Sequence, residues 1–493
     1  MRFRLPPFRF TNEFFVLLLP IFFVLHGYTQ YFTVIPFVDV IKLLGGYLLV
    51  TILVSMISLL FFHSWKKAAI FTFMVMAYNF FFGAIHDTLK KILPQGFFTS
   101  YTFLIPLTLT FLVIVFIMTK RGRSSFVKVS SYLNWSLLIL ILIDATLLTG
   151  KLLKKNQQIT AYNKADLTKC DSCTKPDIYL ILADEYAGKQ ELKDLMKFDN
   201  STFEQQLQAR GFKVLQNTKS NYNFTAYSMS SMLNMEYLQP VPNNKVTTAG
   251  INKCTDLINH SSFPAYLKSI GYSIKNYSIF DVQNIPTSSE TRFLQNKIRL
   301  ISAQTFIGRI DRDIRFNLIV RLKWKSETRR FVMKELDEIN HLYNNTIKIA
   351  GSSEQPKFVY THLLMPHYPY FCDSIGRMYD EEKIFYNTDD TNAYLQYLEF
   401  SNKRFLYLID QIITKSKNPP VIIFMSDHGF REFKSPVPQQ YEFMNINALY
   451  LPSKAYSKFY DGMSNVNQFR ALLNTIDNQH LPILKDSTVF LKE

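Results

Sequence analysis

Two short segments rich in metal-binding side chains stand at the ends of apolar runs. Asp427 and His428 follow the run VIIFMS, and Asp184 and Glu185 end the run PDIYLILADE. A carboxylate and an imidazole that converge where a strand gives way to a turn suit Zn²⁺ or Mn²⁺. One of the two adjacent acids would supply a further oxygen ligand, and spacing alone leaves open which one. For an isolated Asp-His-Gly, a turn with a solvated histidine is an equally good interpretation.

A cluster of hydroxyl side chains provides a candidate nucleophile. Thr225, Ser228, Ser230 and Ser231 lie together where an apolar helical pattern begins. A helix N-terminus accommodates phosphate oxygens, and a Thr or Ser hydroxyl held beside a metal is an activated nucleophile. The plainer interpretation is an ordinary helix N-cap, and for this segment taken alone it is the stronger one.

One further histidine has a backbone that is held in place. His367 lies between Pro366 and Pro369 in the segment MPHYPY, which disfavours a helical conformation there. A histidine fixed in this way can donate to a phosphoryl oxygen or protonate a leaving group. A single histidine is more often structural, so its role depends on what lies beside it.

These side chains need a scaffold that gathers strand ends, and the C-terminal part of the chain predicts one. Short apolar runs that end in polar residues alternate there with helical patterns. This alternation is typical of a mostly parallel sheet covered by helices on both faces, an α/β/α sandwich. Ligands bind outside the carboxyl ends of such strands. The predicted strands are 176–185, 212–217, 272–278, 357–367 and 421–429, and the predicted helices are 202–210, 261–270, 328–349, 392–416 and 466–477.

The first 150 residues have the composition of a membrane domain. They contain twelve Lys/Arg residues and four acidic residues. Positive charges placed between long apolar runs are typical of membrane proteins. Although the 493-residue chain has a net charge of +16, no Lys/Arg run interleaved with aromatic residues favours nucleic acid. Five apolar stretches approach the ~20 residues that a spanning helix needs: about 14–35, 40–62, 68–86, 98–118 and 132–149.

The sequence therefore predicts a five-helix transmembrane domain over 1–150, a polar linker over 151–175 and an extracytoplasmic catalytic domain over 176–493. Nine Lys/Arg residues lie near the membrane on the side of the N-terminus and six on the other side. This bias predicts a cytoplasmic N-terminus and, after five crossings, an external C-terminal part. Asp144 lies near the outer end of the last stretch, where it is either functional or reaches the interface.

Together these motifs resemble the alkaline phosphatase superfamily. The closer match is its membrane-anchored sulfatase-like branch, which includes lipoteichoic acid synthases and lipid A phosphoethanolamine transferases. PDIYLILADE resembles that family's first strand with its acidic metal ligand, and SDHG resembles its late Asp-His metal pair. Thr225-x-x-Ser228 is similar to the nucleophile segment of the phosphoethanolamine transferases, and PHYPY to the substrate-contacting His-Pro segment. The resemblance covers essentially the whole chain, with the motifs in the family's order.

The resemblance implies a two-step transfer of a phospholipid head-group phosphoryl, of the phosphoethanolamine or phosphoglycerol type. Thr225, activated by the metal, would attack the phosphorus, with His367 stabilising charge. A hydroxyl of an envelope glycan or lipid acceptor would then take the phosphoryl group from phospho-threonine. The implied partners are the phospholipid donor, that acceptor and the lipid bilayer of a bacterial inner membrane, which the chain crosses several times. The implied site holds one divalent ion, Zn or Mn, with ligands drawn from Asp184, Glu185, Thr225, Asp427 and His428.

The sequence departs from true sulfatases in one respect. The C/S-x-P-x-R motif that is converted to formylglycine does not occur in it, which argues against sulfate ester hydrolysis. The alternatives are a membrane-anchored phosphoric or sulfuric ester hydrolase that uses water as acceptor, and a binding protein without catalysis or bound metal. His362, Glu185 and His480 are candidate ligands for a second metal. The four cysteines are too few for a disulfide scaffold, and their pairing is open: Cys170, Cys173, Cys254 and Cys372.

Overall fold

The structure of the protein is a computed structural model that forms two compact units. The first unit spans 1–157 together with 295–318, and the second spans 158–294 together with 319–493. Arg2, Arg4, Arg9 and Arg123, which contribute to the predicted orientation, lie outside the described residues, as does part of the predicted linker, 159–166. The described residues are 13–32, 35–93, 96–122, 126–158, 167–170, 172–287, 289, 298–315, 322, 324–354, 356–385 and 388–492.

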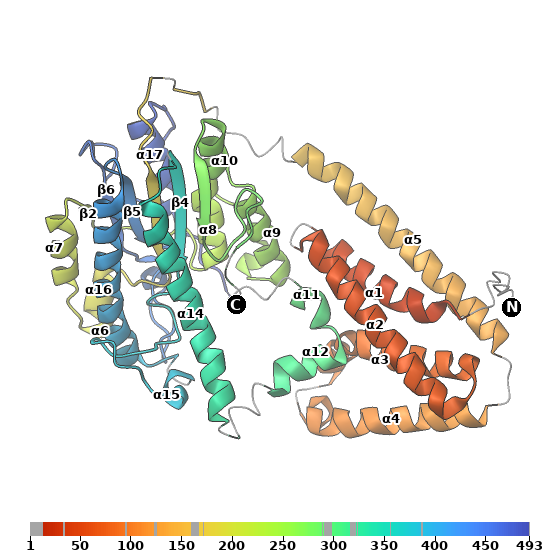
Figure 1. The fold of residues 1–493 in the computed structure, drawn as a ribbon. Coiled ribbons are helices and arrows are strands. Elements are labelled where there is room, and N and C mark those ends of the chain that lie inside the picture. Colours follow the sequence, from red (N-terminus) through yellow and green to blue (C-terminus); the bar gives the residue numbers. More distant parts are fainter. Residues whose placement is uncertain are drawn as a thin grey trace. The chain divides into compact units, whose positions relative to one another are not determined.

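Within the described residues, the first unit contains five long apolar helices (Figure 1). Four of them are long and apolar enough to cross a membrane, whereas the first has 16 residues and is shorter. At 1.5 Å per residue the first helix covers about 24 Å, less than the ~30 Å hydrocarbon core. The predicted set of apolar helices is thus present, with a shorter first member. The helices are α1 (Phe15–Gln30), α2 (Phe37–Phe62), α3 (Trp65–Ile92), α4 (Tyr101–Arg121) and α5 (Val127–Gln158), with a 3-10 turn η1 (Phe97–Thr99) before α4.

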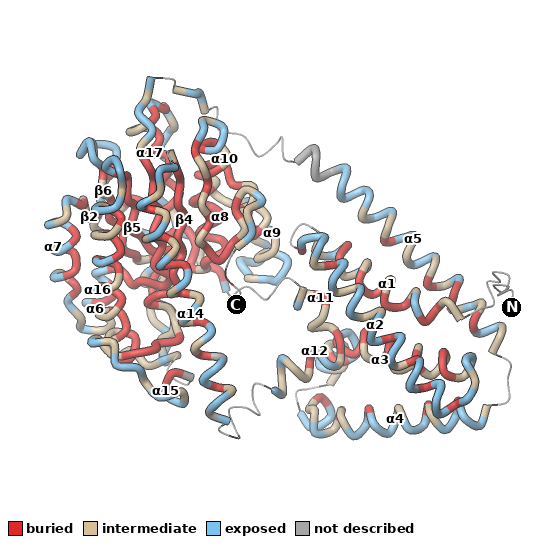
Figure 2. Tube along the Cα trace, viewed as in Figure 1, coloured by how far each residue is buried: buried red, intermediate tan, exposed pale blue. Residues whose placement is uncertain are grey.

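The outer faces of these helices are apolar. Leu60, Met118 and Leu142 expose 72%, 68% and 57% of their surface, and exposed residues line much of α2, α4 and α5 (Figure 2). A soluble protein rarely exposes so large an apolar surface, whereas helices that face lipid do so because their backbone groups are already paired. Inside the unit, aromatic rings pack together, and the rings of Phe23 and Phe80 stack with centroids 4.4 Å apart.

Asp144 has a specific partner in this unit. Nδ1 of His26 on α1 lies 3.1 Å from both carboxylate oxygens of Asp144 on α5. Asp144 is 5% exposed, so the pair is held between helices. The helix α5 continues to Gln158, beyond residue 151, where the sequence predicts a linker.

A segment from far along the chain packs against one end of these helices. Its elements are α11 (Arg299–Ser302), α12 (Phe306–Ile310) and the π-helix η3 (Asp311–Arg315). The guanidinium of Arg309 donates to both carboxylate oxygens of Asp87, at 2.9 and 2.6 Å. The N–H of Gly83 donates to the carbonyl oxygen of Gln304 at 2.8 Å, and a Cβ at Gly83 would lie 2.7 Å from that oxygen. The sequence predicts this segment as part of 176–493, but it contacts helices of the first unit, α1 to α4.

The second unit is built on a six-stranded sheet, counted over the described residues, in the order β2-β6-β5-β1-β4-β3. Strands β3, β4, β1 and β5 run parallel to one another, whereas β6 is antiparallel to both β5 and β2. The sheet is therefore mostly parallel, as predicted. Every residue of β1, β4 and β5 is buried, which explains their continuous apolar runs. The strands are β1 (Ile178–Ala183), β2 (Lys213–Leu215), β3 (Ser273–Tyr277), β4 (Lys357–Leu363), β5 (Val421–Ser426) and β6 (Asn447–Tyr450).

Helices cover both faces of this sheet. Thr346 on α14 hydrogen-bonds Thr361 on β4 at 2.7 Å, and the ring of Phe263 on α10 contacts Phe358 on the same strand. Side chains alternate along a strand, so Thr361 and Phe358 face opposite sides and the two helices form separate layers. The helices are α6 (Lys189–Met196), α7 (Ser201–Ala209), α8 (Thr225–Asn234), α9 (Thr248–Asn259), α10 (Ser262–Ser269), α14 (Lys325–Ala350), α15 (Glu381–Phe385), α16 (Thr391–Lys415) and α17 (Gln468–Ile476), with 3-10 turns η2 (Pro242–Asn244), η4 (Gln439–Phe443) and η5 (Asn465–Asn467).

Candidate metal centre and active site

Strand register brings the predicted acidic residues to one edge of the sheet. Ala183, the last residue of β1, pairs with Ser426 at the end of β5 and with Leu363 at the end of β4. Asp184 and Asp427 are the next residues along β1 and β5. The two carboxylates therefore leave neighbouring parallel strands at the same carboxyl edge, where such sheets bind ligands.

Asp184, Asp427 and His428 form a buried group that fits a metal ion. One ligand atom from each residue lies within 4.8 Å of the others, and the residues are 1%, 0% and 0% exposed. Oδ1 of Asp184 and Oδ2 of Asp427 are buried and have no hydrogen-bond partner within the described residues. Leaving carboxylate oxygens buried in this way is costly unless a cation balances them. Two oxygens and one imidazole nitrogen suit Zn²⁺ or Mn²⁺.

Thr225 places its hydroxyl beside this group. Its Oγ1 lies 3.2 Å from Nε2 of His428, and the residue is 1% exposed. The N-cap of α8 is Phe224, whose backbone is extended, so Thr225 is the first helical residue rather than the cap. Ser228, one turn later, donates its hydroxyl to the carbonyl oxygen of Asp427 at 2.7 Å. Ser228 thus supports the turn that carries Asp427 and His428, and Thr225 presents its hydroxyl to His428.

Hydrogen bonds and charge keep the ligands in metal-binding forms. Nε2 of His362 lies 2.8 Å from Oδ2 of Asp184. Burial raises the pKa of the Asp184 carboxyl, but the His362 hydrogen bond and the charges of His367, His362 and His428 outweigh it and lower the pKa to about 2. Burial lowers the pKa of His428, although the carboxylate of Asp427 opposes this. An ionised carboxylate and a neutral imidazole are the forms that bind metal.

The side chain of Glu185 lies near Arg431 and His367 and is not part of the group formed by Asp184, Asp427 and His428. Its Oε1 accepts the backbone N–H of Arg431 at 3.0 Å, and its Oε2 lies 3.6 Å from Nε2 of His367. Burial raises the pKa of Glu185, while His367 and Arg431 offset part of that rise. Burial lowers the pKa of His367, but the charges of Glu185 and Asp184 outweigh it and raise the pKa to about 9. His367 therefore carries a proton at neutral pH.

Two residues of this region carry no chemical motif in the sequence. Glu191 is completely buried, and its Oε2 accepts the N–H of Phe430 at 3.3 Å. Burial raises its pKa well above the usual range, and its carboxyl supports the turn after β5 through this hydrogen bond. Arg431 follows His428 by three positions, but its place in the site depends on the loop conformation, which the sequence pattern does not signal. His480 is exposed and lies outside the metal-ligand group.

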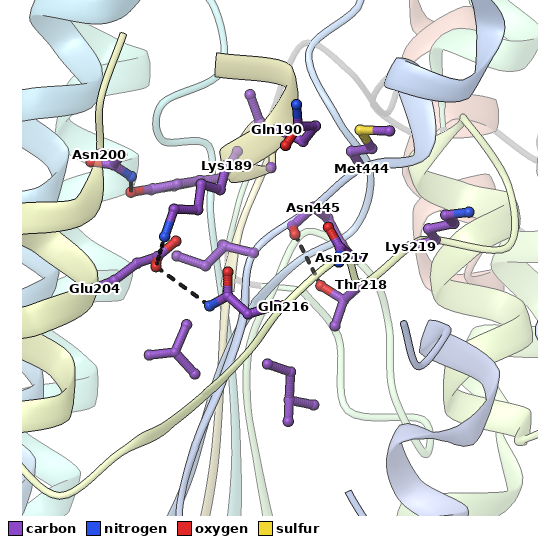
Figure 3. A pocket seen from close by; sticks show the side chains of 16 residues that line it. Lys189, Gln190, Asn200, Glu204, Gln216, Asn217, Thr218, Lys219, Met444 and Asn445 are labelled. Atoms are coloured by element: carbon purple, nitrogen blue, oxygen red, sulfur yellow. Dashed lines mark hydrogen bonds and ion pairs between the residues drawn. The ribbon is translucent and has the colours of Figure 1, made fainter. Parts of the chain in front are cut away.

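A polar cavity of about 240 Å³ opens at the same carboxyl edge of the sheet (Figure 3). It lies among the segments that follow β1 and β2 and precede β6, and the three metal-group residues do not line it. Lys189 and Gln216 donate to Oε2 of Glu204 at 2.7 and 3.4 Å (Figure 3). The lining also supplies amide and hydroxyl groups from Gln190, Asn200, Asn217, Thr218 and Asn445.

The cysteines form one disulfide and leave two buried thiols. Cys170 and Cys173 are bonded to each other, so their sulfurs are not free to join nearby Asp477 in holding a metal. Cys254 and Cys372 are buried and unpaired. Burial raises the pKa of each thiol to about 12, which makes both poor nucleophiles.

Comparisons with known proteins give one family match. A family model described as Sulfatase matches residues 177–471, and a search of curated proteins finds no match. One similar solved structure is the C-terminal periplasmic domain of EcEptC from Escherichia coli in complex with Zn, at 12% identity over 64% of this chain and 85% of that one, with a TM-score of 0.39. Another is the integral membrane protein lipooligosaccharide phosphoethanolamine transferase A from Neisseria meningitidis, at 11% identity over 97% and 96%, with a TM-score of 0.35. The family match begins at the residue before β1 and ends inside α17, so it includes every residue of the metal group.

Proposed function

Because this chain belongs to the sulfatase family of metal-dependent enzymes in the alkaline phosphatase superfamily, we propose that it transfers a phospholipid head-group phosphoryl. The group would be of the phosphoethanolamine or phosphoglycerol type, and the acceptor an envelope glycan or lipid. The observation that carries the proposal is the Thr225 hydroxyl, 3.2 Å from His428 in a buried carboxylate–imidazole group.

The site favours attack by Thr225 for electrostatic reasons. Asp184, Asp427 and His428 would hold a divalent cation, Zn or Mn, whose charge would favour an ionised hydroxyl nearby and offset charge on the phosphoryl oxygens. Ser228 holds the turn that carries Asp427 and His428 through its hydrogen bond to a backbone carbonyl. The nucleophile and the ligand group are therefore fixed by one helix, α8.

The proposed reaction has two displacements at phosphorus. In the first, the ionised Oγ1 of Thr225 bonds to phosphorus while the bond to the diacylglycerol oxygen breaks, and the protonated imidazole of His367 gives that oxygen a proton. In the second, the acceptor hydroxyl bonds to phosphorus, Oγ1 of Thr225 leaves, and the acceptor's proton returns to His367. With water as acceptor, the same sequence would hydrolyse the donor.

The polar cavity supports a hydroxyl-rich acceptor. Its lining includes several side-chain amides and hydroxyls, which pair with sugar or glycerol hydroxyls as donors and acceptors. Its segments continue directly from Glu185, and Asn445 in its lining donates to the carbonyl oxygen of Ser426 at 2.7 Å. The cavity therefore shares backbone segments with the metal-ligand group. We assign it to the acceptor.

The proposed location is a bacterial inner membrane with the second unit outside. The segment 298–315 contacts the carboxyl ends of α1 and α3 and the start of α4. If α1 to α5 cross alternately, those ends and the end of α5 lie on one side of the bilayer, which supports placing residues after 158 on that side. The Lys/Arg bias makes that side external.

Mass analysis of the trapped enzyme tests the proposal. Full-length protein in detergent, loaded with Zn²⁺ or Mn²⁺, is incubated with vesicles of phosphatidylethanolamine or phosphatidylglycerol and no added acceptor. A mass increase that matches one head-group phosphoryl, mapped to Thr225 by fragmentation, supports it, and the mass names the donor. The Thr225→Ala variant should show no adduct, and Ser231→Ala is the matched control that should keep it. Head-group release without an adduct on wild-type protein would favour direct attack by water.

A further inference from the structure

The side chain of Arg431 is placed for chemistry rather than for structural pairing. It is 12% exposed, and its Nε is buried without a hydrogen-bond partner in the part of the chain that the structure describes. The nearest carboxylate oxygen, Oε1 of Glu185, lies 4.0 Å from Nε and already accepts the backbone N–H of Arg431. Burying a guanidinium without full pairing is costly, so an anionic partner would stabilise it.

The guanidinium stacks on Phe224, the residue that precedes the proposed nucleophile. Its carbon lies 4.4 Å from the centroid of the Phe224 ring, and Phe224 directly precedes Thr225 in the chain. Stacking on an aromatic face orients the guanidinium plane. The charge is also close to the ligand group, because it opposes protonation of His428 and favours ionisation of Glu185.

The carboxylate of Glu185 lies near the side chains of His367 and Arg431 but hydrogen-bonds neither of them. Glu185 faces His367 with one oxygen and Arg431 with the other, at 3.6 and 4.0 Å. Both distances exceed a hydrogen bond, so Nε of Arg431 keeps an N–H donor without a partner among the described residues. A tetrahedral oxyanion presents pairs of oxygens that a guanidinium binds with two parallel hydrogen bonds.

We propose that Arg431 binds the non-bridging oxygens of the transferred phosphoryl group while Thr225 attacks it. This inference rests on the proposed function for the identity of the reacting group, but not for the binding itself. Arg431 holds the oxyanion from the side of Phe224, and the metal-ligand group holds it from the strand ends.

Phosphate binding tests the role without turnover. The full-length Thr225→Ala protein is loaded with Mn²⁺, and its affinity for inorganic phosphate is measured by calorimetry. Adding Arg431→Gln should weaken phosphate binding roughly 10- to 100-fold, as expected for loss of a charge-assisted hydrogen bond, and leave Mn²⁺ affinity unchanged. Arg431→Met keeps the packing on Phe224 and should give the same loss, whereas Arg431→Lys should lose less.

Arg404 provides a matched control. Its guanidinium carbon lies 4.0 Å from the ring of Tyr343, and its Nε is also buried without a hydrogen-bond partner among the described residues. Arg404→Gln should leave phosphate affinity unchanged. Unchanged phosphate affinity in Arg431→Gln and Arg431→Met would overturn the inference, and so would an equal loss of Mn²⁺ affinity, which would make Arg431 a support of the ligand group.

Turnover measurements distinguish a failure of the Arg431 role from a failure of the threonine mechanism. With Thr225 restored, hydrolysis of bis(4-nitrophenyl) phosphate should fall by a similar factor in Arg431→Gln. If the phosphate-binding loss is found but Thr225→Ala keeps its turnover, Arg431 still binds the oxyanion and the threonine mechanism fails. If Thr225→Ala is inactive and Arg431→Gln is not impaired, only the role of Arg431 fails.

Discussion

The hydroxyl oxygen of Thr225 lies 3.2 Å from Nε2 of His428, although 203 positions separate the two residues in the chain. The contact joins the first turn of α8 to the turn after β5. Ser228 on the same helix bonds the backbone of Asp427 at 2.7 Å, so α8 both holds the metal-ligand turn and presents a hydroxyl to it. The hydroxyl of Thr225 is therefore available for chemistry, whereas the hydroxyl of Ser228 holds the turn after β5.

Replacing Thr225 with Ala should lower turnover of the lipid donor by several orders of magnitude, because loss of a covalent nucleophile is not compensated by the remaining groups. The metal content should stay near that of the wild type. Asp427→Ala should also be inactive, but with little bound metal. Turnover together with metal analysis of the purified proteins distinguishes the two. Near-normal turnover in the Thr225→Ala protein would show that another hydroxyl or water is the nucleophile.

Replacing His362 with Ala should weaken metal binding. Its Nε2 lies 2.8 Å from Oδ2 of Asp184 and orients that carboxylate. Removing such a supporting group typically costs 10- to 100-fold in metal affinity, which a competition titration with a chelating indicator measures. His341, exposed on α14, is the control, and His341→Ala should bind metal normally. Equal affinities in both variants would show that Asp184 needs no such support.

The protonation of His367 should depend on Glu185. In metal-free protein, NMR titration of the His367 ring should give a pKa of about 9, because the carboxylates outweigh burial. Glu185→Gln removes the largest favourable charge, so the pKa should fall. The folded-state pKa exceeds the ordinary value near 6.5. The charged imidazole therefore contributes full stability below about pH 6.5, and this contribution is lost as the pH rises towards 9. A titration midpoint unmoved by Glu185→Gln would contradict this coupling.

Changes in the polar cavity should affect the acceptor step. Gln216→Leu removes an amide that donates to Glu204 at 3.4 Å in the cavity lining. The expected result is a lower ratio of transfer to hydrolysis, with release of the donor head group nearly unchanged. The ratio is measured with a labelled phospholipid donor and glycerol as a model acceptor. Gln440→Leu, on the exposed turn η4 and outside the lining, should leave the ratio as in the wild type.

The second unit should face the exterior. A reporter that is active only outside the cytoplasm, fused after Gln158 at the end of α5, should be active, and a cytoplasm-specific reporter at the same position should be silent. The reason is the nine-to-six Lys/Arg bias in the loops. The reverse pattern would place residues 159–493 in the cytoplasm and exclude an envelope acceptor.

The sheet was predictable because its central strands are buried on both faces. β1, β4 and β5 are continuous apolar runs, and the polar residues after them mark their carboxyl ends, so Asp184 and Asp427 could be placed together. β6 was not predicted because it has only four residues and includes the polar Asn447, whose amide donates to Gln468 at 2.8 Å. That pairing depends on tertiary structure and leaves no pattern along the chain.

The remaining parts of the site depend on geometry that spacing does not encode. The meeting of His362 with Asp184 follows from the register of β4 against β1, in which His362 pairs with Leu182. Arg431 reaches Phe224 through the conformation of a loop. The short helices α11 and α12 were missed because their partners, including Asp87, lie some two hundred positions away.

The contacts of the segment 298–315 bear on how the second unit can be prepared in isolation. Ile301 is 1% exposed, the ring of Phe306 lies 4.8 Å from that of Phe82, and Arg309 is paired with Asp87. A truncated chain that begins after α5 would retain this segment without Phe82 and Asp87. Two apolar side chains and one buried arginine would then face water, which favours aggregation. Detergent, or deletion of this segment, should be needed to keep the shortened protein monodisperse.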